Sequence, residues 1–210
     1  MTDDRKEDSR ETSGAGGSAD APETEPSQAS ATPAPETETQ ATDIDFPIVG
    51  IGASAGGLEA FEAFFTHMPA GGGIAFVLVQ HLHAPHKSLL VDLLRRYTAM
   101  EVSQVEDGVR LEPDHVYVIP PGKDLALLHG TLQLMAPPED RGPHLTIDHF
   151  FRTLAQDQGE RAICIILSGT GSDGTVGLQA VKEAGGMAMV QDPDEAEYDG
   201  MPRSAIATGL

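Results

Sequence analysis

Residues 48–58 read IVGIGASAGGL, an apolar run that breaks into small residues and takes helical spacing from Leu58 onward. From Gly52 to Gly56 the spacing is G-x-S-x-G, which is typical of a sharp strand-to-helix turn that holds a serine oxygen clear of the sheet edge. The glycines let the backbone approach a substrate closely, and the helix N-terminus offers N–H groups to a developing oxyanion. Ser54 is therefore the first candidate nucleophile.

The same letters also fit G-x-G-x-x-A, from Gly50 to Ala55, which is a dinucleotide-binding turn when an acidic residue ends the next strand. The next strand-like run, residues 74–79, is followed by Gln80 and His81, where a ribose-binding carboxylate would be needed. The dinucleotide-binding hypothesis therefore lacks its second anchor, although it stays open beside that of a plain tight turn. The imidazole of His81, which follows this strand, strengthens the hypothesis that Ser54 is an activated nucleophile.

The first 45 residues differ sharply in composition from the rest of the chain. Residues 1–45 hold 12 Asp or Glu against 3 Lys or Arg, with four prolines and no large apolar side chain between Met1 and Ile44. Such a segment buries too little to fold, so we expect a disordered acidic tail. It lacks the apolar core of a signal peptide, and no run of the chain is long and apolar enough to cross a bilayer. We therefore expect a cytoplasmic protein.

The remaining stretch, residues 46–210, has the size of one ordinary domain with a sizeable core. It carries 21 acidic against 10 basic residues. This balance argues against nucleic acid or an anionic membrane as partner, because phosphate binding needs clustered Lys and Arg. Cys164 lies alone in an apolar run, so we expect an inert core thiol in a reducing compartment. The sequence gives no indication of the oligomeric state.

Hydrophobic spacing predicts strands at 48–51, 74–79, 115–119, 125–128, 132–135, 162–167 and 187–190. Helical spacing lies between them, over 58–68, 89–97, 147–154 and 176–181. Continuous apolar strands that alternate with amphipathic helices indicate a doubly wound α/β domain, with a mostly parallel sheet and helices on both faces. Residues 115–135 differ, because His129-Gly130-Thr131 separates two short strands, and we expect a small antiparallel hairpin there.

In such a fold, functional groups gather at the carboxyl ends of the strands. Three predicted strand ends carry polar or glycine-rich turns, and each supplies one residue of a hydrolase triad: Ser54, His81 and Asp173. A serine hydroxyl is a poor nucleophile until a base takes its proton. His81 can do so near neutral pH, and Asp173 can fix the imidazole tautomer. The chain order Ser, His, Asp differs from the Ser, acid, His order of α/β-hydrolases.

Each candidate also has a non-catalytic interpretation. Ser54 can be a cap in a glycine-rich turn, and Asp173 can be the N-cap of a helix that starts near Thr175. Imidazoles from one loop can instead converge on a zinc ion. The candidate ligands are His81, His83 and His86. No carboxylate or thiol lies beside them to complete the site, and we expect neither a metal nor a cofactor.

Four motifs in order resemble the catalytic domain of the chemotaxis protein-glutamate methylesterase family. They are IGASAGG at 51–57, VQH at 79–81, LSGTGSDG at 167–174 and GMPRSAI at 200–206. The resemblance covers nearly all of 46–210, and the family's serine, histidine and aspartate fall on Ser54, His81 and Asp173. It implies hydrolysis of glutamyl methyl esters on the cytoplasmic domain of methyl-accepting chemotaxis receptors, often with deamidation of receptor glutamines. Backbone N–H groups near Ala55 and Thr170 would hold the oxyanion.

The sequence departs from the family pattern in several places. Ala55 and Thr170 stand where the family commonly has Thr and Met, so rate or substrate choice differs if those side chains shape the pocket. The acidic tail takes the place of the usual receiver domain, and we expect no phosphorylation switch from a fused receiver. Residues 147–152 and 202–210 look most like the variant fused to a methyltransferase, and a final strand or helix is expected after Leu210. The alternative is a catalytically silent receptor-associated or scaffold module, against which all three triad residues argue.

Overall fold

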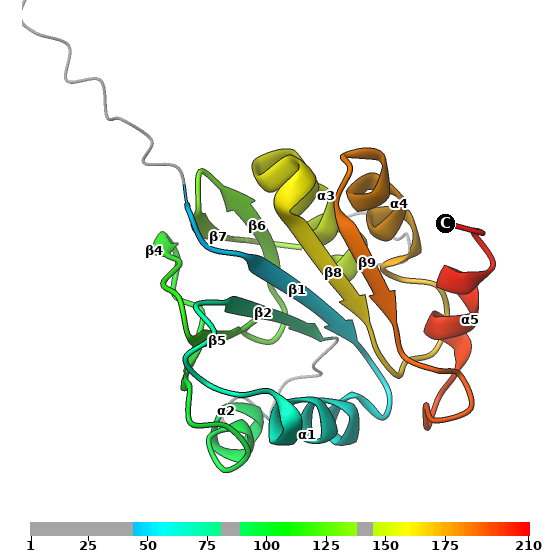
Figure 1. The fold of residues 1–210 in the computed structure, drawn as a ribbon, viewed down its shortest axis with the longest axis horizontal. Helices are drawn as coiled ribbons and strands as arrows, with labels where there is room; N and C mark the ends of the chain where they lie inside the picture. Colours follow the sequence, from blue (N-terminus) through cyan, green and yellow to red (C-terminus); the bar gives the residue numbers. More distant parts are fainter. Residues whose placement is uncertain (1–43, 81–88, 138–144) are drawn as a thin grey trace, which may run out of the picture. The chain divides into compact units, whose positions relative to one another are not determined.

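The structure is a computed structural model, and it describes residues 44–80, 89–137 and 145–210 (Figure 1). The predicted acidic tail therefore lies almost entirely outside the described residues and stays a prediction. Ile44, which that prediction included, is buried in the core and lies so close to Gly130 that a side chain there would collide with it. The Arg161 guanidinium also donates a 2.7 Å hydrogen bond to the Ile44 carbonyl. The packed domain thus includes Ile44.

A six-stranded sheet forms the centre of the domain, and all its neighbouring strands pair in parallel. The strands are β1 (Ile48–Ala53), β2 (Ala75–Gln80), β3 (Glu101–Gln104), β5 (His115–Val118), β8 (Ala162–Ile166) and β9 (Met187–Val190). Their order is β3-β5-β2-β1-β8-β9, which places β1 between β2 and β8 (Figure 1). All six residues of β1 are buried, as a strand covered on both faces requires.

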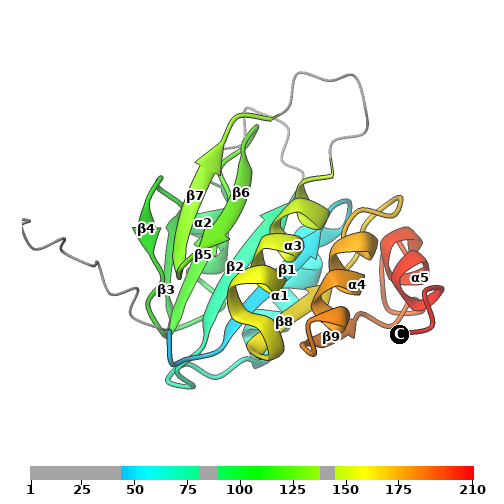
Figure 2. The same ribbon diagram turned by 90° about the horizontal axis from the view of Figure 1, so that it is seen from above.

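Helices cover both faces of this sheet, which confirms the predicted doubly wound fold (Figures 1 and 2). On one face lie α1 (Gly57–His67) and α2 (Leu89–Leu94), and on the other lie α3 (Thr146–Gln158) and α4 (Thr175–Glu183). A 3₁₀ turn, Gly159–Arg161, follows α3, and α5 (Gly200–Ile206) packs beside α4. None of the helices in the described ranges is both long and apolar enough to span a bilayer.

A small antiparallel sheet stands beside the main one, in the order β4-β7-β6 (Figure 2). Its strands are β4 (Val109–Arg110), β6 (Asp124–Leu128) and β7 (Thr131–Met135). The tight turn of its hairpin is His129–Gly130, and both residues have positive φ. The Asp157 carboxylate of α3 accepts hydrogen bonds from both of their N–H groups. The predicted hairpin is therefore confirmed, and α3 anchors it.

The prediction was wrong about residues 115–119, which it grouped with the hairpin. β5 pairs in parallel with β2 and β3 in the main sheet. Pro120 and Pro121, which follow it, lack the N–H groups needed to continue a ladder into β6. The prediction also missed β3, β4 and α5. These elements are short, and β3 is an edge strand with a single buried side chain. Each is too short for its hydrophobic residues to show the repeat of a strand or a helix.

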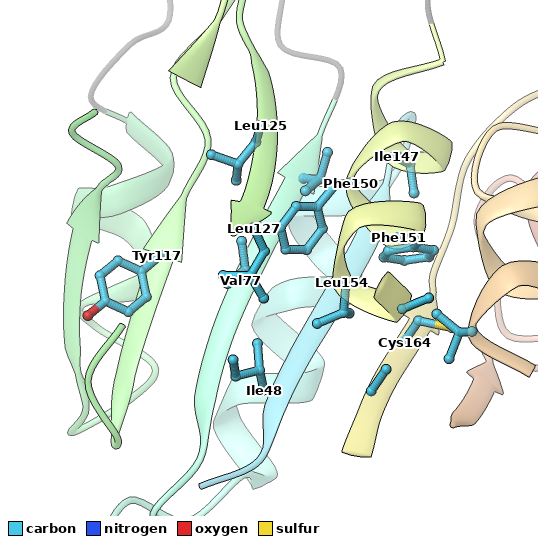
Figure 3. Close-up of a cluster of buried hydrophobic side chains, with 14 of the residues drawn as sticks. Ile48, Val77, Tyr117, Leu125, Leu127, Ile147, Phe150, Phe151, Leu154 and Cys164 are labelled. Carbon is cyan, nitrogen blue, oxygen red and sulfur yellow. The ribbon is translucent and has the colours of Figure 1, made fainter. Parts of the chain in front are cut away.

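Helix α3 lies directly against the backbone of β1. A Cβ at Gly50 would come within 2.9 Å of the Phe150 ring, and one at Gly52 would collide with Ile147. Phe150 and Phe151 fill the space between α3 and the sheet, together with side chains of β6 (Figure 3). The two glycines of the G-x-G pattern therefore make room for a helix. Helix packing thus explains these two glycines without a bound dinucleotide.

We predict that Gly50→Ala lowers the free energy of unfolding by about 1–3 kcal/mol, because the added methyl group overpacks the contact with α3. Urea unfolding measures the change. Gly72→Ala is the matched control, since a Cβ at Gly72 would meet its nearest neighbour at 3.8 Å and its φ is not in the left-handed region. Equal stability of the two variants would contradict the close approach of α3 to β1.

Candidate active site

The parallel pairing places the carboxyl ends of β1, β2 and β8 side by side. The last residues of β1 and β2 pair, Ala53 with Gln80, and the end of β8 lies opposite Gly52. The turn at Ser54 is therefore flanked on one side by the end of β2 and on the other by the chain that leaves β8. This is the edge of a parallel sheet where α/β proteins place their ligands.

Two of the three predicted triad residues, Ser54 and Asp173, belong to the described residues. His81 lies outside them, and so do His83 and His86 of the alternative zinc site. Within the described ranges, no group of three or more His, Cys, Asp or Glu side chains is placed to hold a metal ion. The structure thus locates the candidate nucleophile and acid, while the part played by the imidazoles stays a prediction.

The Ser54 turn is fixed by hydrogen bonds from both flanking segments. The Ser54 N–H donates to the Ser168 carbonyl at 3.0 Å, and the Gln80 side-chain amide donates to the Ser54 carbonyl at 3.1 Å. Gly57 N–H closes the turn with a second bond to that carbonyl. A Cβ at Gly169 would lie 3.1 Å from the Ser54 Cβ, so the two turns are in close contact. The backbone that carries the serine is therefore held on each side.

Ser168 ties the serine turn to a later loop. Its side chain is buried, and its hydroxyl donates to the Ala55 carbonyl at 2.9 Å while accepting from the Tyr198 N–H at 3.0 Å. The Tyr198 carbonyl in turn accepts from Gly169 N–H. Sequence reasoning did not select Ser168 or Gln80, although both stand inside the quoted motifs. Their spacing carries no signal, because each acts on a backbone group distant in sequence.

Asp173 is buried, and its carboxylate accepts three hydrogen bonds from backbone N–H groups. The donors are Ile147 at 3.0 Å, Asp148 at 2.9 Å and its neighbour Gly174 at 2.8 Å. Ile147 and Asp148 belong to the first turn of α3. The predicted alternative, an N-cap of α4, was wrong about the helix, because the N-cap of α4 is Gly174 and no side chain caps it. Asp173 caps α3 instead.

Asp148 is a second buried carboxylate at this place, and sequence reasoning missed it. One of its oxygens accepts a 2.7 Å hydrogen bond from Gly177 N–H, in the first turn of α4. Burial raises the pKa of the Asp148 carboxyl; the bond from Gly177 opposes this shift, and the charge of Asp173 adds to it. Two acidic groups therefore lie side by side where the strand ends meet, a setting typical of functional sites.

The two N–H groups expected to hold an oxyanion belong to Ala55 and Thr170. In the part of the chain that the structure describes, no hydrogen bond engages either group. Ala55 is half-buried in the serine turn, and Thr170 is exposed in the turn after β8. Neighbouring carbonyl groups do form hydrogen bonds. Ala55 C=O accepts from the Ser168 hydroxyl, and Gly169 C=O, which precedes Thr170 N–H, accepts from Met201 N–H. Their role as an oxyanion hole stays a prediction.

Residues 49–210, most of the sequence, match the profile of the CheB methylesterase family. The chain belongs to the CheB methylesterase family. The resemblance inferred from the four motifs is thereby confirmed at the level of the family.

Named relatives of this CheB-family chain are similar over most of its folded part. A protein-glutamate methylesterase/protein-glutamine glutaminase 2 of Xanthomonas oryzae pv. oryzae is 36% identical over 77% of this chain and 46% of that protein. A putative protein-glutamate methylesterase/protein-glutamine glutaminase of Leptospira interrogans is 33% identical over 78% of this chain and 85% of that protein. An uncharacterized 104.1 kDa protein of Rhodobacter capsulatus is 50% identical over 58% of this chain and 13% of that protein. The chain thus spans less than half the length of several relatives.

A solved structure supports the same assignment. The catalytic domain of Thermotoga maritima CheB methylesterase superposes with a TM-score of 0.73 and 28% sequence identity, over 79% of this chain and 90% of that chain. The mostly parallel sheet with helices on both faces is therefore the fold of a known CheB catalytic domain.

An acidic loop borders the serine turn of this CheB domain. Residues 191–199 follow β9, and the Glu197 side chain lies so close that a Cβ at Gly56 would meet its carboxylate at 2.9 Å. The loop also carries Asp192, Asp194, Glu195 and Asp199. Arg203 of α5 pairs with Asp199 at 2.5 Å, an exposed contact that neutralises part of this charge. This edge of the site therefore carries acidic side chains that repel anionic groups near the serine turn.

The raised pKa of Asp148 predicts a pH dependence. A carboxyl whose folded pKa lies above its unfolded value contributes stability below the unfolded pKa, and loses that contribution as the pH rises through the folded pKa. Asp148→Asn cannot ionise. Relative to wild type, this variant should therefore gain unfolding free energy as the pH rises from below about 3.9 to neutrality. Denaturant unfolding of both proteins across this range measures it.

Asp192→Asn, an exposed change of the same net charge, is the control for overall electrostatics. A stability difference for Asp148→Asn that is constant with pH, or that moves in the opposite direction, would contradict the raised pKa.

Proposed function

We propose that this domain is a serine hydrolase that removes methyl esters from glutamate side chains of chemotaxis receptors. The observation that carries the proposal is the clamped serine turn: Ser54 is bonded through its backbone to Gln80 and Ser168, beside the turn that ends in the buried Asp173. This matches what nucleophilic catalysis needs, a serine on a rigid strand-to-helix turn with an acid close by. The names of the relatives support the same reaction class.

In the first step, the Ser54 hydroxyl oxygen attacks the ester carbonyl carbon while His81 takes its proton. The negative charge that forms on the carbonyl oxygen is bound by the N–H groups of Ala55 and Thr170. Asp173 keeps the imidazole in the correct tautomer and stabilises its protonated form. Collapse of the tetrahedral intermediate breaks the bond to the methoxy group, which leaves as methanol with the proton from His81.

In the second step, water attacks the glutamyl ester on Ser54 and gives a proton to His81. The ester bond breaks, the serine regains its proton from His81, and the glutamic acid side chain that is released gives its own proton to solvent and becomes a carboxylate. This product is anionic where the substrate was neutral. The Glu197 carboxylate beside the turn disfavours its rebinding, because like charges repel. Deamidation of a receptor glutamine follows the same steps, with ammonia as the leaving group.

The substrate and its location follow from the same proposal. The partner is the cytoplasmic domain of a methyl-accepting chemotaxis receptor, and the place of action is the cytoplasm. The net charge of −20 argues against nucleic acid as a second partner. No cofactor takes part in the proposed acyl transfer, which uses the side chains and backbone of this chain.

We also propose that this domain is closest to the variant joined to a methyltransferase. Support comes from residues 147–152 and 202–210, which look most like that variant. The 50% identity to an uncharacterized 104.1 kDa protein, of which the matched region is a small part, fits a domain that belongs to a larger protein. An immunoblot of the native source with an antibody against residues 46–210 tests it. A band near the mass of the isolated chain, 22.1 kDa, would contradict the proposal.

Ser54→Ala should remove nearly all methanol release from methylated receptor, because loss of the nucleophile leaves only binding and oxyanion stabilisation. The folded structure should survive, since the turn is held by backbone groups of Ser54 that alanine also has. Methanol assay and circular dichroism measure both effects. Retained activity with an unchanged spectrum would reject the serine mechanism and revive the zinc hypothesis, and a chelator should otherwise have no effect.

Asp173→Asn should lower kcat by about 10⁴-fold, as loss of a triad carboxylate does. The side chain also caps α3, so part of any loss can come from weakened folding, and the measurement must separate the two. Asp157→Asn is the matched control, because Asp157 likewise binds two backbone N–H groups but at the far end of α3. An Asp173→Asn enzyme as active as this control would show that Asp173 serves the helix alone.

A further inference from the structure

Helices α3 and α4 exchange their N-terminal caps. Neither has a side-chain cap at its own N-cap residue, which is Leu145 for α3 and Gly174 for α4. Asp173, just before α4, accepts from the N–H groups of the first turn of α3. Asp148, in that first turn, accepts from Gly177 N–H in the first turn of α4. Besides the bond from its neighbour Gly174, the Asp173 carboxylate therefore caps the other helix, and Asp148 of α3 does the same for α4.

This exchange has an electrostatic cause. The N-terminus of a helix carries a partial positive charge and unpaired N–H groups. The close approach of two such ends buries N–H groups that water cannot reach, and an unpaired buried N–H costs about 1–3 kcal/mol. Asp148 and Asp173 satisfy these donors with negative charge, and both are themselves buried. Removal of either carboxylate therefore leaves the other helix end without its partner.

Packing makes the arrangement stiff. A Cβ at Gly177 would lie 2.5 Å from the Phe151 Cβ and 2.9 Å from the Asp148 carbonyl oxygen, so α3 and α4 touch through backbone. A Cβ at Gly174, whose φ is +89°, would lie 2.9 Å from Ile147. Little space remains for one helix end to slide past the other. The bond from Gly177 N–H to Asp148 then fixes where α4 begins.

The same helix end reaches the strand of the nucleophile. Ile147 packs against the bare backbone of Gly52, two residues before Ser54, and its own N–H binds the Asp173 carboxylate. The first turn of α3 thus touches β1 with a side chain and Asp173 with its backbone. The distance between the serine turn and the acid is set through this turn, which Asp148 holds against α4.

We propose that Asp148 is a positioning residue for catalysis, which holds the Asp173 carboxylate in place by capping α4 from the first turn of α3. This inference rests on the proposed hydrolase function. Asp148 itself contacts backbone, and its effect on the reaction passes through Asp173. A displacement of about 1 Å at a catalytic group can cost about 10²-fold in rate. The residue should therefore matter for kcat and leave substrate affinity unchanged.

The test compares three variants in methanol release from methylated receptor, with kcat expressed per folded molecule. The folded fraction is taken from an unfolding curve at the assay temperature. Asp148→Ala should lower kcat about 10²-fold with KM unchanged. Asp148→Asn keeps an acceptor oxygen for Gly177 N–H and should recover kcat to within about fivefold of wild type, since Asn caps helices nearly as well as Asp.

Asp157→Ala is the matched control, because it removes two carboxylate-to-backbone bonds from the other end of α3. It should lose stability and keep kcat per folded molecule within about twofold. If Asp148→Ala behaves like Asp157→Ala, Asp148 is merely structural and the inference is overturned, while the hydrolase function stands. If the wild-type chain releases no methanol, the proposed function fails, and the positioning role fails with it.

Discussion

Close packing of α3 on the bare backbone of β1 is the constraint on which the site depends. Gly50 and Gly52 present no side chains to the helix, so its aromatic face reaches the strand itself. The first turn of α3 contacts Gly52 through Ile147 and donates hydrogen bonds to Asp173. The central strand therefore lacks side chains at two positions, and as a result α3 contacts both the strand that precedes the nucleophile and the carboxylate of Asp173.

The second constraint is that the N-terminal ends of α3 and α4 and the carboxylates of Asp148 and Asp173 are buried next to one another. Asp173 accepts hydrogen bonds from N–H groups of the first turn of α3, and Asp148 accepts one from Gly177 in α4, so the negative charges face the positive ends of helices. Their mutual repulsion remains, and it contributes to the raised pKa of Asp148. Local instability of this kind is common at functional sites, where geometry is kept at the expense of stability.

Much of the fold and part of the site were predictable from the sequence. Long apolar runs predicted the strands that precede the three turns, and the rule that ligands gather at strand ends selected Ser54, His81 and Asp173. Ser54 and Asp173 belong to the described residues, and the catalytic roles of all three stay predictions. The capping of α3 by Asp173 was not predictable, because its N–H donors lie 25 and 26 residues away in the sequence. Asp148 was missed for the same reason. β5 was assigned to the wrong sheet because strand patterns do not reveal pairing partners.

The hydrogen bond from Ser54 N–H to the Ser168 carbonyl joins segments more than a hundred residues apart. During synthesis, β1 and β2 therefore leave the ribosome long before β8 exists to complete the serine turn. Contacts of such long sequence separation form late in folding, because the intervening chain must first be ordered. A nascent or partly folded chain thus presents its serine without a clamped turn, and hydrolytic competence arises together with the finished sheet.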